Sequence, residues 1–418
     1  MESSSQTKQL QIRFITKQEQ YSVADTPFAV PATISVVELN NLVNHLLKES
    51  NVIEGKDVNF DFIAASEFVR SPLGEHLETR GHSTEVVVDI EYLERLPAPQ
   101  PQDCLLHDDW VSSAHTSKKW IVSGCYDNTV HLWSIEGTHI MTIPGHTGAV
   151  KAVSWISQSE DDATFLSGSH DQTVLLWQWK SAKNEIECIR VCKGHSKSIE
   201  CIGVSPDKTR FASGSWDNML KIWSTSMDDD DDEPTVKRKP GKMANVKTPL
   251  VTLKGHKEAV SGLSWKDNTE MATCSWDHTI RIWDTEMSSS IQEMAGTKAF
   301  FDVDWSQLNH LLITASSDKN IKLYDPRSKE GQVCKTTFTS HRDWVMSVRW
   351  SKTKEHLFIS SSNDKTVKLW DTRSSQVPMF DMTGHSDKVL SCDWSQPELV
   401  VSGGADNTLR IFKVSNEI

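Results

Sequence analysis

Hydrophobic and polar residues follow two different rhythms along the chain. Near the N-terminus, residues 9–15 (QLQIRFI) place every second apolar side chain on one face, which predicts a strand. Residues 35–50 begin with Ser35 and Glu38 in the Ser-x-x-Glu spacing of a capping box, which predicts the start of a helix. Apolar residues then recur at helical spacing: Val36, Leu39, Val43, Leu46 and Leu47.

Three more strands are predicted in this region, at 21–30, 58–64 and 85–93. The last of them alternates through Val86, Val88, Ile90 and Tyr92. The order β, β, α, β, β fits a small α+β ubiquitin-like (β-grasp) domain, which we place at residues 8–93. The three prolines in LPAPQPQ then predict a stiff linker at 94–102.

Beyond the linker, short strand-like runs are organised by a repeat. Its template is an Asp with Ser or Thr four residues before it and an aromatic residue six after it. The template fits seven times, at Ser123/Asp127/Trp133, Ser167/Asp171/Trp177, Ser213/Asp217/Trp223, Thr273/Asp277/Trp283, Thr314/Asp318/Tyr324, Ser360/Asp364/Trp370 and Ser402/Asp406/Phe412. Successive Asp residues are 44, 46, 60, 41, 46 and 42 positions apart.

A histidine lies 20 to 25 positions before six of the seven Asp residues: His107, His146, His195, His256, His341 and His385. The fifth copy has Thr297 in that place. Gly81-His82 resembles the Gly-His pairs of the repeats, but the positions around the expected Asp103 are Pro99 and Asp109, so the template fails there.

Four short strands per copy, with Gly-His early and Trp-Asp late, are typical of WD40 blades. The sequence therefore predicts a mainly β protein, with a seven-bladed WD40 β-propeller over residues 103–418 after the small α+β domain. Residues 101–106 are expected to form the outermost strand of the last blade, beside the strand that ends at Phe412.

The repeated residues are interpreted as a structural hydrogen-bond network rather than as chemistry. Ser, His and Asp are the residue types of a hydrolase triad, but a catalytic set is needed once and no nucleophile elbow is visible. We therefore expect no enzyme activity. The network members that we single out are His146, Ser167, Asp171, Trp177, His195, Ser213, Asp217, Trp223, His256, Thr273, Asp277, Trp283, His341, Ser360, Asp364 and Trp370.

The composition argues against several classes of partner and location. The net charge of −13 gives no overall field toward nucleic acid or an anionic membrane. No apolar run approaches membrane-spanning length, and the start MESSSQTKQLQ lacks a signal-peptide core, so we expect a soluble protein of the cytosol or nucleus. The eight cysteines form no CxxC pair and are expected to be free thiols. Cys188 and Cys192 are expected on one face of a strand.

The single long step of the repeat contains a run of acidic residues followed by basic ones. Such a composition predicts a disordered insertion at about 225–248, between the third and fourth strands of one blade. Its basic part includes Lys237, Arg238, Lys239 and Lys242, which form either a nuclear import signal or a merely solvated loop.

The whole chain resembles the WD repeat-containing protein 12 family of ribosome biogenesis factors. The resemblance rests on VADTPFAVP, VNFDFI, APQPQDCLLHDDWVSS and SWDHTIRIWD. It implies a non-enzymatic scaffold of the nucleolus and nucleoplasm that acts in large-subunit assembly and pre-rRNA processing. The implied partners are pescadillo, a Bop/Erb-type WD propeller protein, the pre-60S particle and the AAA ATPase midasin, which removes the factor through its ubiquitin-like domain. No membrane partner is implied.

The same resemblance gives Glu85, in HSTEVVVDIEY, a particular role. In this family a Glu before the last strand of the ubiquitin-like domain completes a Mg²⁺ site held by midasin, and Glu85 matches that position. A carboxylate suits the oxygen-only coordination of Mg²⁺. The alternative is an ordinary solvated acid, and Glu78 and Glu91 are further candidates nearby. The chain is expected to hold no cofactor of its own.

For the propeller, candidate partner contacts are four tryptophans: Trp110, Trp216, Trp276 and Trp344. Two interpretations stay open, since they could be exposed anchors at a rim or buried packing between blades. A different function is also open. WDTR at 370–373 matches the WDxR motif of substrate receptors of cullin-RING ubiquitin ligases, although YDPR at 324–327 looks like a sibling of the same repeat.

Overall fold

The computed structural model describes residues 8–53, 57–83, 86–159, 162–226, 245–328 and 334–414. The chain divides into two compact units. The first unit comprises residues 1–98 with 371–379, and the second comprises residues 99–370 with 380–418. Each unit has its own core and is described by itself below.

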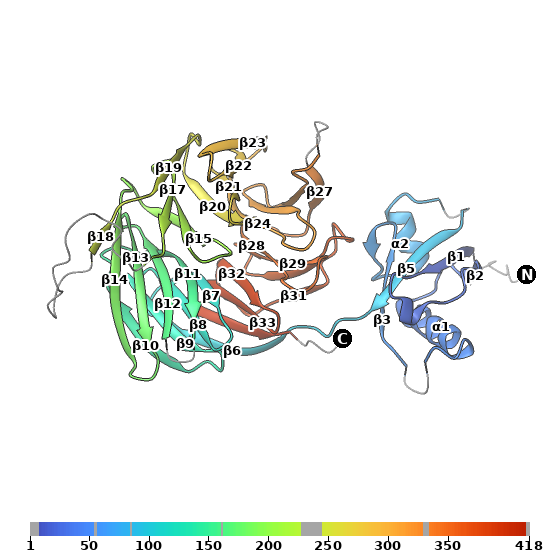
Figure 1. The fold of residues 1–418 in the computed structure, drawn as a ribbon. Coiled ribbons are helices and arrows are strands. Elements are labelled where there is room, and N and C mark those ends of the chain that lie inside the picture. The colour runs from blue at the N-terminus through green and yellow to red at the C-terminus, as the bar shows by residue number, and fades with distance from the viewer. Residues whose placement is uncertain are drawn as a thin grey trace, which may run out of the picture. The chain divides into compact units, whose positions relative to one another are not determined.

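The first unit is a mixed five-stranded sheet with two helices (Figure 1). The strand order is β2-β1-β5-β3-β4, in which β1 and β5 run parallel, as in a β-grasp. The elements are β1 (Gln9–Ile15), a 3₁₀ turn η1 (Glu19–Tyr21), β2 (Phe28–Pro31), α1 (Val36–Glu49), β3 (Phe60–Ala64), β4 (Glu67–Phe68), α2 (Leu73–Thr79) and β5 (Val88–Glu94).

Local sequence explains why these elements form. Ser35 and Glu38 make the predicted capping box, and the buried residues of α1 include Leu39, Val43 and Leu47. Three predictions need correction. The strand predicted at 21–30 is limited to β2 and begins only at Phe28. The helix α2 and the strand β4 were not foreseen, and β5 starts at Val88, because Val86 lies outside the strand and is largely exposed.

The second unit is a seven-bladed propeller, as the repeat predicted. The strands of the first four blades are β7 (Val111–Thr116), β8 (Trp120–Cys125), β9 (Thr129–Ser134) and β10 (His139–Pro144); β11 (Val150–Gln158), β12 (Asp162–Ser169), β13 (Thr173–Lys180) and β14 (Glu185–Lys193); β15 (Ile199–Val204), β16 (Arg210–Ser215), β17 (Met219–Ser224) and β19 (Val251–Lys254); and β20 (Val260–Trp265), β21 (Glu270–Ser275), β22 (Thr279–Asp284) and β23 (Ser289–Ala295).

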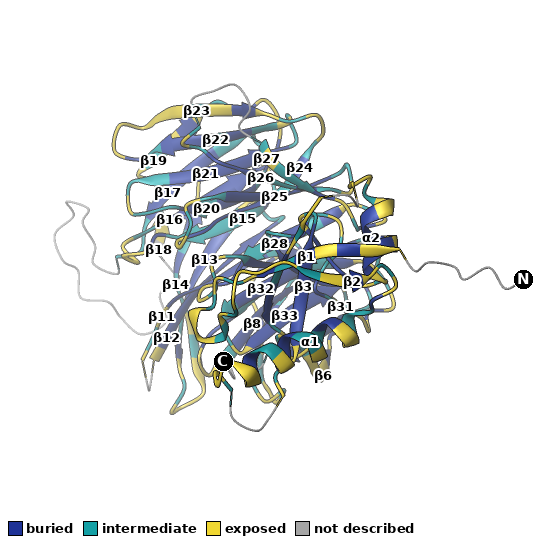
Figure 2. Ribbon diagram, turned by 90° about the vertical axis from the view of Figure 1, so that its right-hand side faces the viewer, coloured by how far each residue is buried: buried dark blue, intermediate teal, exposed yellow. Residues whose placement is uncertain are grey.

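The remaining blades are β24 (Phe300–Trp305), β25 (Leu312–Ser316), β26 (Ile321–Tyr324) and β27 (Cys334–Phe338); β28 (Val345–Trp350), β29 (Leu357–Ser362), β30 (Val367–Asp371) and β31 (Phe380–Met382); and β32 (Val389–Gln396), β33 (Leu399–Gly404), β34 (Thr408–Lys413) and β6 (Gln100–Leu106). Apolar side chains on neighbouring blades pack face to face and bury the inner strands, whereas an outer strand such as β23 stays mostly exposed (Figure 2).

The ring closes through a strand from the start of the second unit. β6 pairs antiparallel with β34, with Phe412 opposite Pro101, as the sequence predicted for residues 101–106. The strand begins at Gln100, so the last three residues of the predicted linker belong to it. Because β6 covers the outer edge of β34, the last blade gains its fourth strand from the N-terminal side of the ring.

The insertion of the third blade lies between β17 and β19, its third and fourth strands. Residues 227–244, with Lys237, Arg238, Lys239 and Lys242, lie outside the described residues. The prediction of a structureless stretch is wrong at its C-terminal end. There β18 (Asn245–Lys247) pairs in parallel with β14 of the preceding blade, because that outer strand offers an open edge.

The repeated Asp organises a tight turn in every blade. In all seven copies the residue after the Asp has a positive φ, between 60° and 73°: Asn128, Gln172, Asn218, His278, Lys319, Lys365 and Asn407. None of these is glycine, so local hydrogen bonds must hold the conformation. In the second blade, one carboxylate oxygen of Asp171 accepts from the backbone N–H and hydroxyl of Thr173, at 3.0 and 2.6 Å.

The other carboxylate oxygen joins a buried chain of polar groups. In the third blade, His195 Nδ1 lies 2.9 Å from Asp217, His195 Nε2 lies 2.8 Å from Ser213 Oγ, and Trp223 Nε1 donates to that oxygen at 2.8 Å. The structure brings the corresponding groups together in three more blades: His146, Ser167, Asp171 and Trp177; His256, Thr273, Asp277 and Trp283; and His341, Ser360, Asp364 and Trp370.

These serines are not available for catalysis. Ser167, Ser213 and Ser360 are 0% exposed, and each hydroxyl is already held by a histidine and an indole. A substrate therefore has no route to them, and their geometry is that of a structural network.

The cysteines are free thiols, as expected, but one prediction about them is wrong. Cys188 and Cys192 do not share a face, because a bulge in β14 shifts the register between Cys188 and Arg190. As a result, Cys188 packs in the core between the first and second blades and Cys192 in the core between the second and third.

We expect Asp217→Ala to lower the free energy of unfolding by roughly 3 kcal/mol, because three hydrogen-bond donors lose their acceptor. These donors are His195 Nδ1 and the backbone N–H groups of Ser196 and Met219. Urea unfolding at neutral pH measures the loss. The exposed Asp207→Ala provides the control, and equal losses in the two variants would contradict a special role for the buried turn.

The same carboxylate predicts an acid-dependent loss of stability. Burial alone would raise the pKa of Asp217, but hydrogen bonds from His195 and Ser196 lower it to about 2. Because the ordinary pKa of Asp is about 3.9, this group stabilises the fold above that pH and loses its contribution as pH falls toward 2. Unfolding of wild type and Asp217→Asn at pH 6 and pH 3 should show a smaller difference at pH 3. A constant difference would contradict the assignment.

Candidate functional site

Aromatic side chains gather at one end of the propeller channel. In each blade, the residue before the turn Asp donates its backbone N–H to the loop that precedes the first strand. Such bonds join Tyr126 to Trp110, Trp276 to Ala259 and Asn363 to Trp344, at 2.9 to 3.1 Å. The turns and the preceding loops therefore lie at the same end of every blade, and residues on both contribute to one surface.

Ring contacts connect these residues into an arc. Successive ring centroids lie 4.6 to 6.0 Å apart in two series, Trp110–Tyr126–His170 and Trp216–Trp276–Phe301–Trp344. Glu200 links the series, because its carboxylate accepts from Trp216 Nε1 at 2.6 Å and lies 3.7 Å from His170 Nε2. We call these seven rings the aromatic arc.

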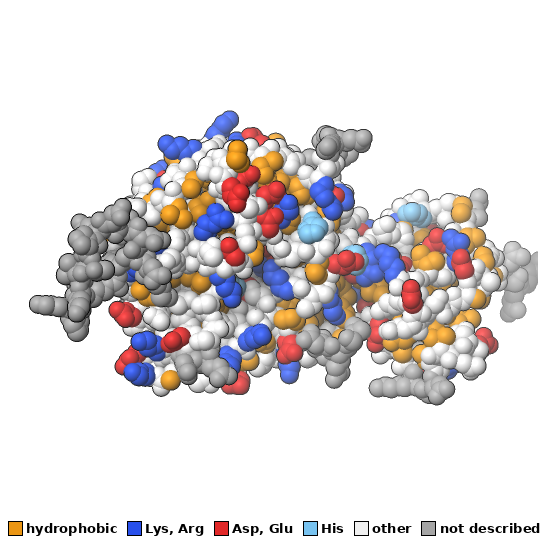
Figure 3. Space-filling view, viewed as in Figure 1, with side chains coloured by type: hydrophobic (Ala, Val, Ile, Leu, Met, Phe, Trp, Pro, Cys, Tyr) orange, Lys and Arg blue, Asp and Glu red, His pale blue; other side chains and the backbone are white. Residues whose placement is uncertain are grey.

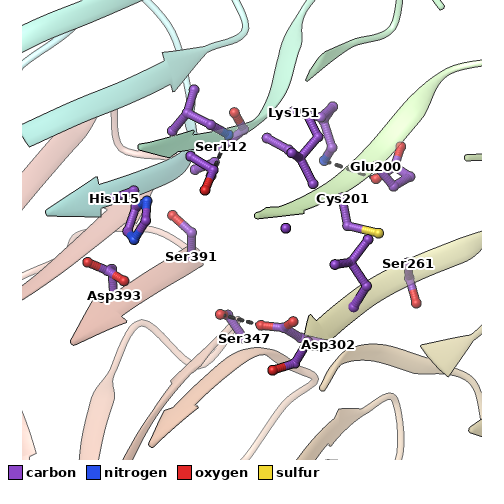
Figure 4. Close-up of a pocket in the computed structure, with 18 of the residues that line it drawn as sticks. Ser112, His115, Lys151, Glu200, Cys201, Ser261, Asp302, Ser347, Ser391 and Asp393 are labelled. Carbon is purple, nitrogen blue, oxygen red and sulfur yellow. Dashed lines mark hydrogen bonds and ion pairs between the residues drawn. The ribbon is translucent and has the colours of Figure 1, made fainter. Parts of the chain in front are cut away.

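The aromatic arc stands over a cavity of about 900 Å³ lined by residues from all seven blades. Figure 4 shows Lys151, Glu200, Asp302 and Ser347 reaching toward this space from different strands. Arg349 also lines the cavity, and its Nη1 lies 2.5 Å from Asp302 Oδ2. The cavity wall is thus lined by paired charges and hydroxyls, whereas its mouth is largely aromatic.

A β-bulge in the first strand of each blade places side chains at the mouth of the cavity. In every blade, the register of the first strand shifts between its first and third residues. The extra residue is Lys151 in the second blade, Glu200 in the third and Phe301 in the fifth. Lys151 Nζ lies 3.6 Å from Glu200 and donates to the Tyr126 hydroxyl at 3.1 Å, so the charged pair fixes neighbouring rings.

Basic residues surround the aromatic arc over the third to sixth blades. The loop before the first strand of each of these blades carries one exposed basic residue: Lys197, Lys257, Lys298 and Arg342. The acidic residues of the same loops are Glu258 and Asp343. Elsewhere, charges of both signs are interspersed over the face of the second unit that Figure 3 shows.

The four predicted contact tryptophans all lie on this surface. Trp344, Trp110 and Trp216 are 47%, 42% and 37% exposed, and Trp276 is partly exposed. Sequence reasoning missed Tyr126, His170 and Phe301. Tyr126 and His170 occupy the same repeat position as Trp216 and Trp276, directly before the turn Asp, so an internal alignment of the copies would have found them. The bulge that presents Phe301 has no sequence signal of this kind.

The predicted metal-contacting residue is a different case. Glu85, with Thr84, lies outside the described residues. Of the other candidates, Glu78 pairs with Lys8 at 3.2 Å. Within the first unit, Glu91 lies 2.8 Å from Arg373 Nη1 and its side chain is 18% exposed, so this carboxylate is already engaged.

Arg373 of the WDTR motif is held by its own turn. Its guanidinium forms two hydrogen bonds to the Asp371 carboxylate, at 2.9 and 2.5 Å. Arg327 of YDPR pairs with Asp325 in the same bidentate way, at 2.9 and 3.2 Å. Because both arginines pair with the Asp two residues before them, this pairing is a feature of the repeat. The Arg373 side chain is also mostly buried.

Neither of the two α-helices in the described part of the chain has the length and apolar character that crossing a bilayer demands.

Comparison with known proteins agrees with the two-part architecture. The NLE (NUC135) domain family matches residues 10–77, and the WD domain, G-beta repeat family matches seven times, at 100–134, 137–178, 186–224, 247–284, 288–325, 332–371 and 376–413. Each WD match joins the outermost strand of one sheet to the first three strands of the next, as at 137–178, which holds β10 and β11 to β13. The matched repeats are therefore offset by one strand from the blades described above.

Similar proteins extend over the whole chain. The Ribosome biogenesis protein WDR12 homolog of Anopheles gambiae is 52% identical over 98% of this chain and 96% of its own length. The homologs of Culex quinquefasciatus and Drosophila virilis are 52% and 49% identical over 97% and 99% of this chain and 95% and 97% of their own lengths. With such identity from end to end, the chain belongs to the WDR12 family of ribosome biogenesis proteins.

Proposed function

We propose that this chain is a non-enzymatic scaffold in assembly of the large ribosomal subunit. In this proposal the propeller joins a complex with pescadillo and a Bop/Erb-type WD propeller protein on pre-60S particles, and supports processing of their pre-rRNA in the nucleolus and nucleoplasm. The observation that carries the proposal is the aromatic arc, since half-exposed tryptophans around a cavity are typical of protein-binding anchors.

The chemistry of the arc indicates what kind of partner surface it suits. Trp and Tyr combine a large apolar area with few rotatable bonds, so they lose little entropy when a partner covers them. The rings are already packed against one another and against Glu200, which limits their rearrangement on binding. The exposed basic residues beside the arc, Lys197, Lys257, Lys298 and Arg342, favour a partner whose contact surface presents acidic groups around apolar ones.

We further propose that the first unit binds the metal-site domain of midasin through Glu85, which supplies a carboxylate oxygen to a Mg²⁺ held by that ATPase. The support is the family membership and the pattern of residues 82–92. Glu91 is a poorer donor because Arg373 already pairs with it. Binding of this kind would let the ATPase remove the factor from the particle.

The ligase-receptor alternative is weaker. Its motif requires an available arginine, whereas Arg373 is committed to Asp371 and Glu91. A surface that reads an arginine needs its guanidinium to be accessible, and a carboxylate already occupies two of its donors here.

For the propeller, Trp344→Ala should weaken binding to the Bop/Erb-type partner at least about thirtyfold, because an aromatic anchor of an interface is worth about 2 kcal/mol or more. Calorimetry with the full-length chain measures the effect. Met287→Ala removes another exposed apolar side chain, distant in the repeat from the aromatic arc, and should leave the affinity unchanged. Equal affinities for wild type and Trp344→Ala would remove the arc from the interface.

For the first unit, Glu85→Ala in the full-length chain should abolish Mg²⁺-dependent binding to the metal-site domain of midasin, because the ion loses one oxygen ligand. Glu78→Ala, which removes a nearby exposed carboxylate, serves as the control and should bind like wild type. Binding that ignores both the Glu85 substitution and chelation would exclude the metal bridge. That result would leave the propeller proposal intact.

A further inference from the structure

The first blade departs from the repeat at two positions that meet in space. Two residues before the turn Asp, the second to sixth blades carry serine: Ser169, Ser215, Ser275, Ser316 and Ser362. The first blade has Cys125 there. Four residues after the Asp, the third to seventh blades carry lysine or arginine: Lys221, Arg281, Lys322, Lys368 and Arg410. The first blade has His131.

These two substitutions place a thiol and an imidazole beside the carboxylate of the turn. The Cys125 thiol, a carboxylate oxygen of Asp127 and a ring nitrogen of His131 all lie within 4.8 Å of one another. Cys125 ends β8, Asp127 stands in the turn and His131 lies in β9, so a single hairpin fixes all three.

The carboxylate is also released from its usual partner. In five other blades, the histidine Nδ1 and the following backbone N–H both contact the turn Asp at 2.8 to 3.0 Å. Among the hydrogen bonds of the described residues, none joins His107 to Asp127. His107 Nδ1 instead lies 3.4 Å from the Leu105 carbonyl, and Asp127 Oδ2 lies 3.5 Å from His131 Nε2.

The surroundings hold the His131 ring in place. Its Nδ1 lies 3.2 Å from Thr142 Oγ1 and 3.5 Å from His139 Nε2. Its Nε2 faces the turn, 2.9 Å from the Thr129 hydroxyl and 3.5 Å from Asp127 Oδ2, so an ion bound there displaces the Thr129 contact. Metal-binding histidines usually have their second ring nitrogen held in this way, because it fixes the orientation of the first.

We propose that Cys125, Asp127 and His131 form a site for a zinc-like divalent transition-metal ion. Sulfur, imidazole and carboxylate together suit Zn²⁺, which binds such ligands at roughly 2.0 to 2.3 Å. The three atoms must draw together by about 1 Å to reach this geometry, and water fills the remaining position. Binding replaces the Cys125 thiol proton, which leaves to solvent.

The ion has a structural role in the first blade. There it takes the place that the histidine occupies in five other blades, since it holds the carboxylate oxygen of Asp127 that no such histidine contacts in the described part of the chain. The Asp127 side chain is 19% exposed, which gives the ion access from solvent, whereas Cys125 is fully buried and cannot serve a metal bound at the surface.

The test uses the full-length chain stripped of metal and titrated with Co²⁺, whose thiolate complexes show a near-ultraviolet sulfur-to-cobalt absorption band. Wild type should bind one equivalent with this band, and Zn²⁺ should displace it. Cys125→Ser should abolish the band. His131→Lys should weaken binding more than about 100-fold, because loss of outer partners alone costs 10- to 100-fold.

Both substitutions install residues that other blades carry at the same positions, so the blade keeps a compatible sequence, and circular dichroism checks the fold. Cys104→Ser removes the exposed thiol, the main source of adventitious binding, and should retain the band. A second readout is the melting temperature, which Zn²⁺ should raise in wild type and in Cys104→Ser only. A band that survives Cys125→Ser, or no band in wild type, would overturn the proposal.

Discussion

The carboxylate of the turn Asp is the interaction on which the propeller depends. It holds a non-glycine residue at positive φ, and in most blades it ends a buried chain that runs through histidine and a hydroxyl to an indole. That chain ties the loop before the first strand to the turn between the second and third. The geometry of any surface formed by these two loops therefore depends on the carboxylate of the turn Asp.

In two blades the turn Asp has a different partner, and the polar groups around it differ accordingly. In the fifth blade, Lys322 replaces histidine as the partner, with its Nζ 2.6 Å from Asp318 and 3.3 Å from the hydroxyl of Thr297. In the first blade, the freed oxygen faces a thiol and an imidazole instead. Repetition makes such departures informative, because the other copies show what an undisturbed blade does.

The repeat made the propeller predictable from sequence, down to the closing strand beside Phe412. The features that escaped prediction have physical reasons. A bulge slips the register without changing composition, which is why Cys188 and Cys192 were placed on one face. The strand β18 forms through pairing with the open edge of β14, and no local pattern reveals a distant edge. The exposure of Trp110 and Trp344 depends on how blades splay around the cavity, so the sequence could name these residues but not choose between anchor and core.

The strand β6 has a mechanical consequence. The covalent path from residues 8–94 into the ring enters at Gln100, and the strand from Gln100 to Leu106 pairs along the edge of β34. A pull transmitted along this segment of the chain is therefore resisted by the backbone hydrogen bonds between β6 and β34. If those hydrogen bonds break, the last blade loses its outer strand and the strand pairing that closes the ring is lost. Tension that reaches β6 from the N-terminal side of the chain thus acts on the strand pair that closes the propeller.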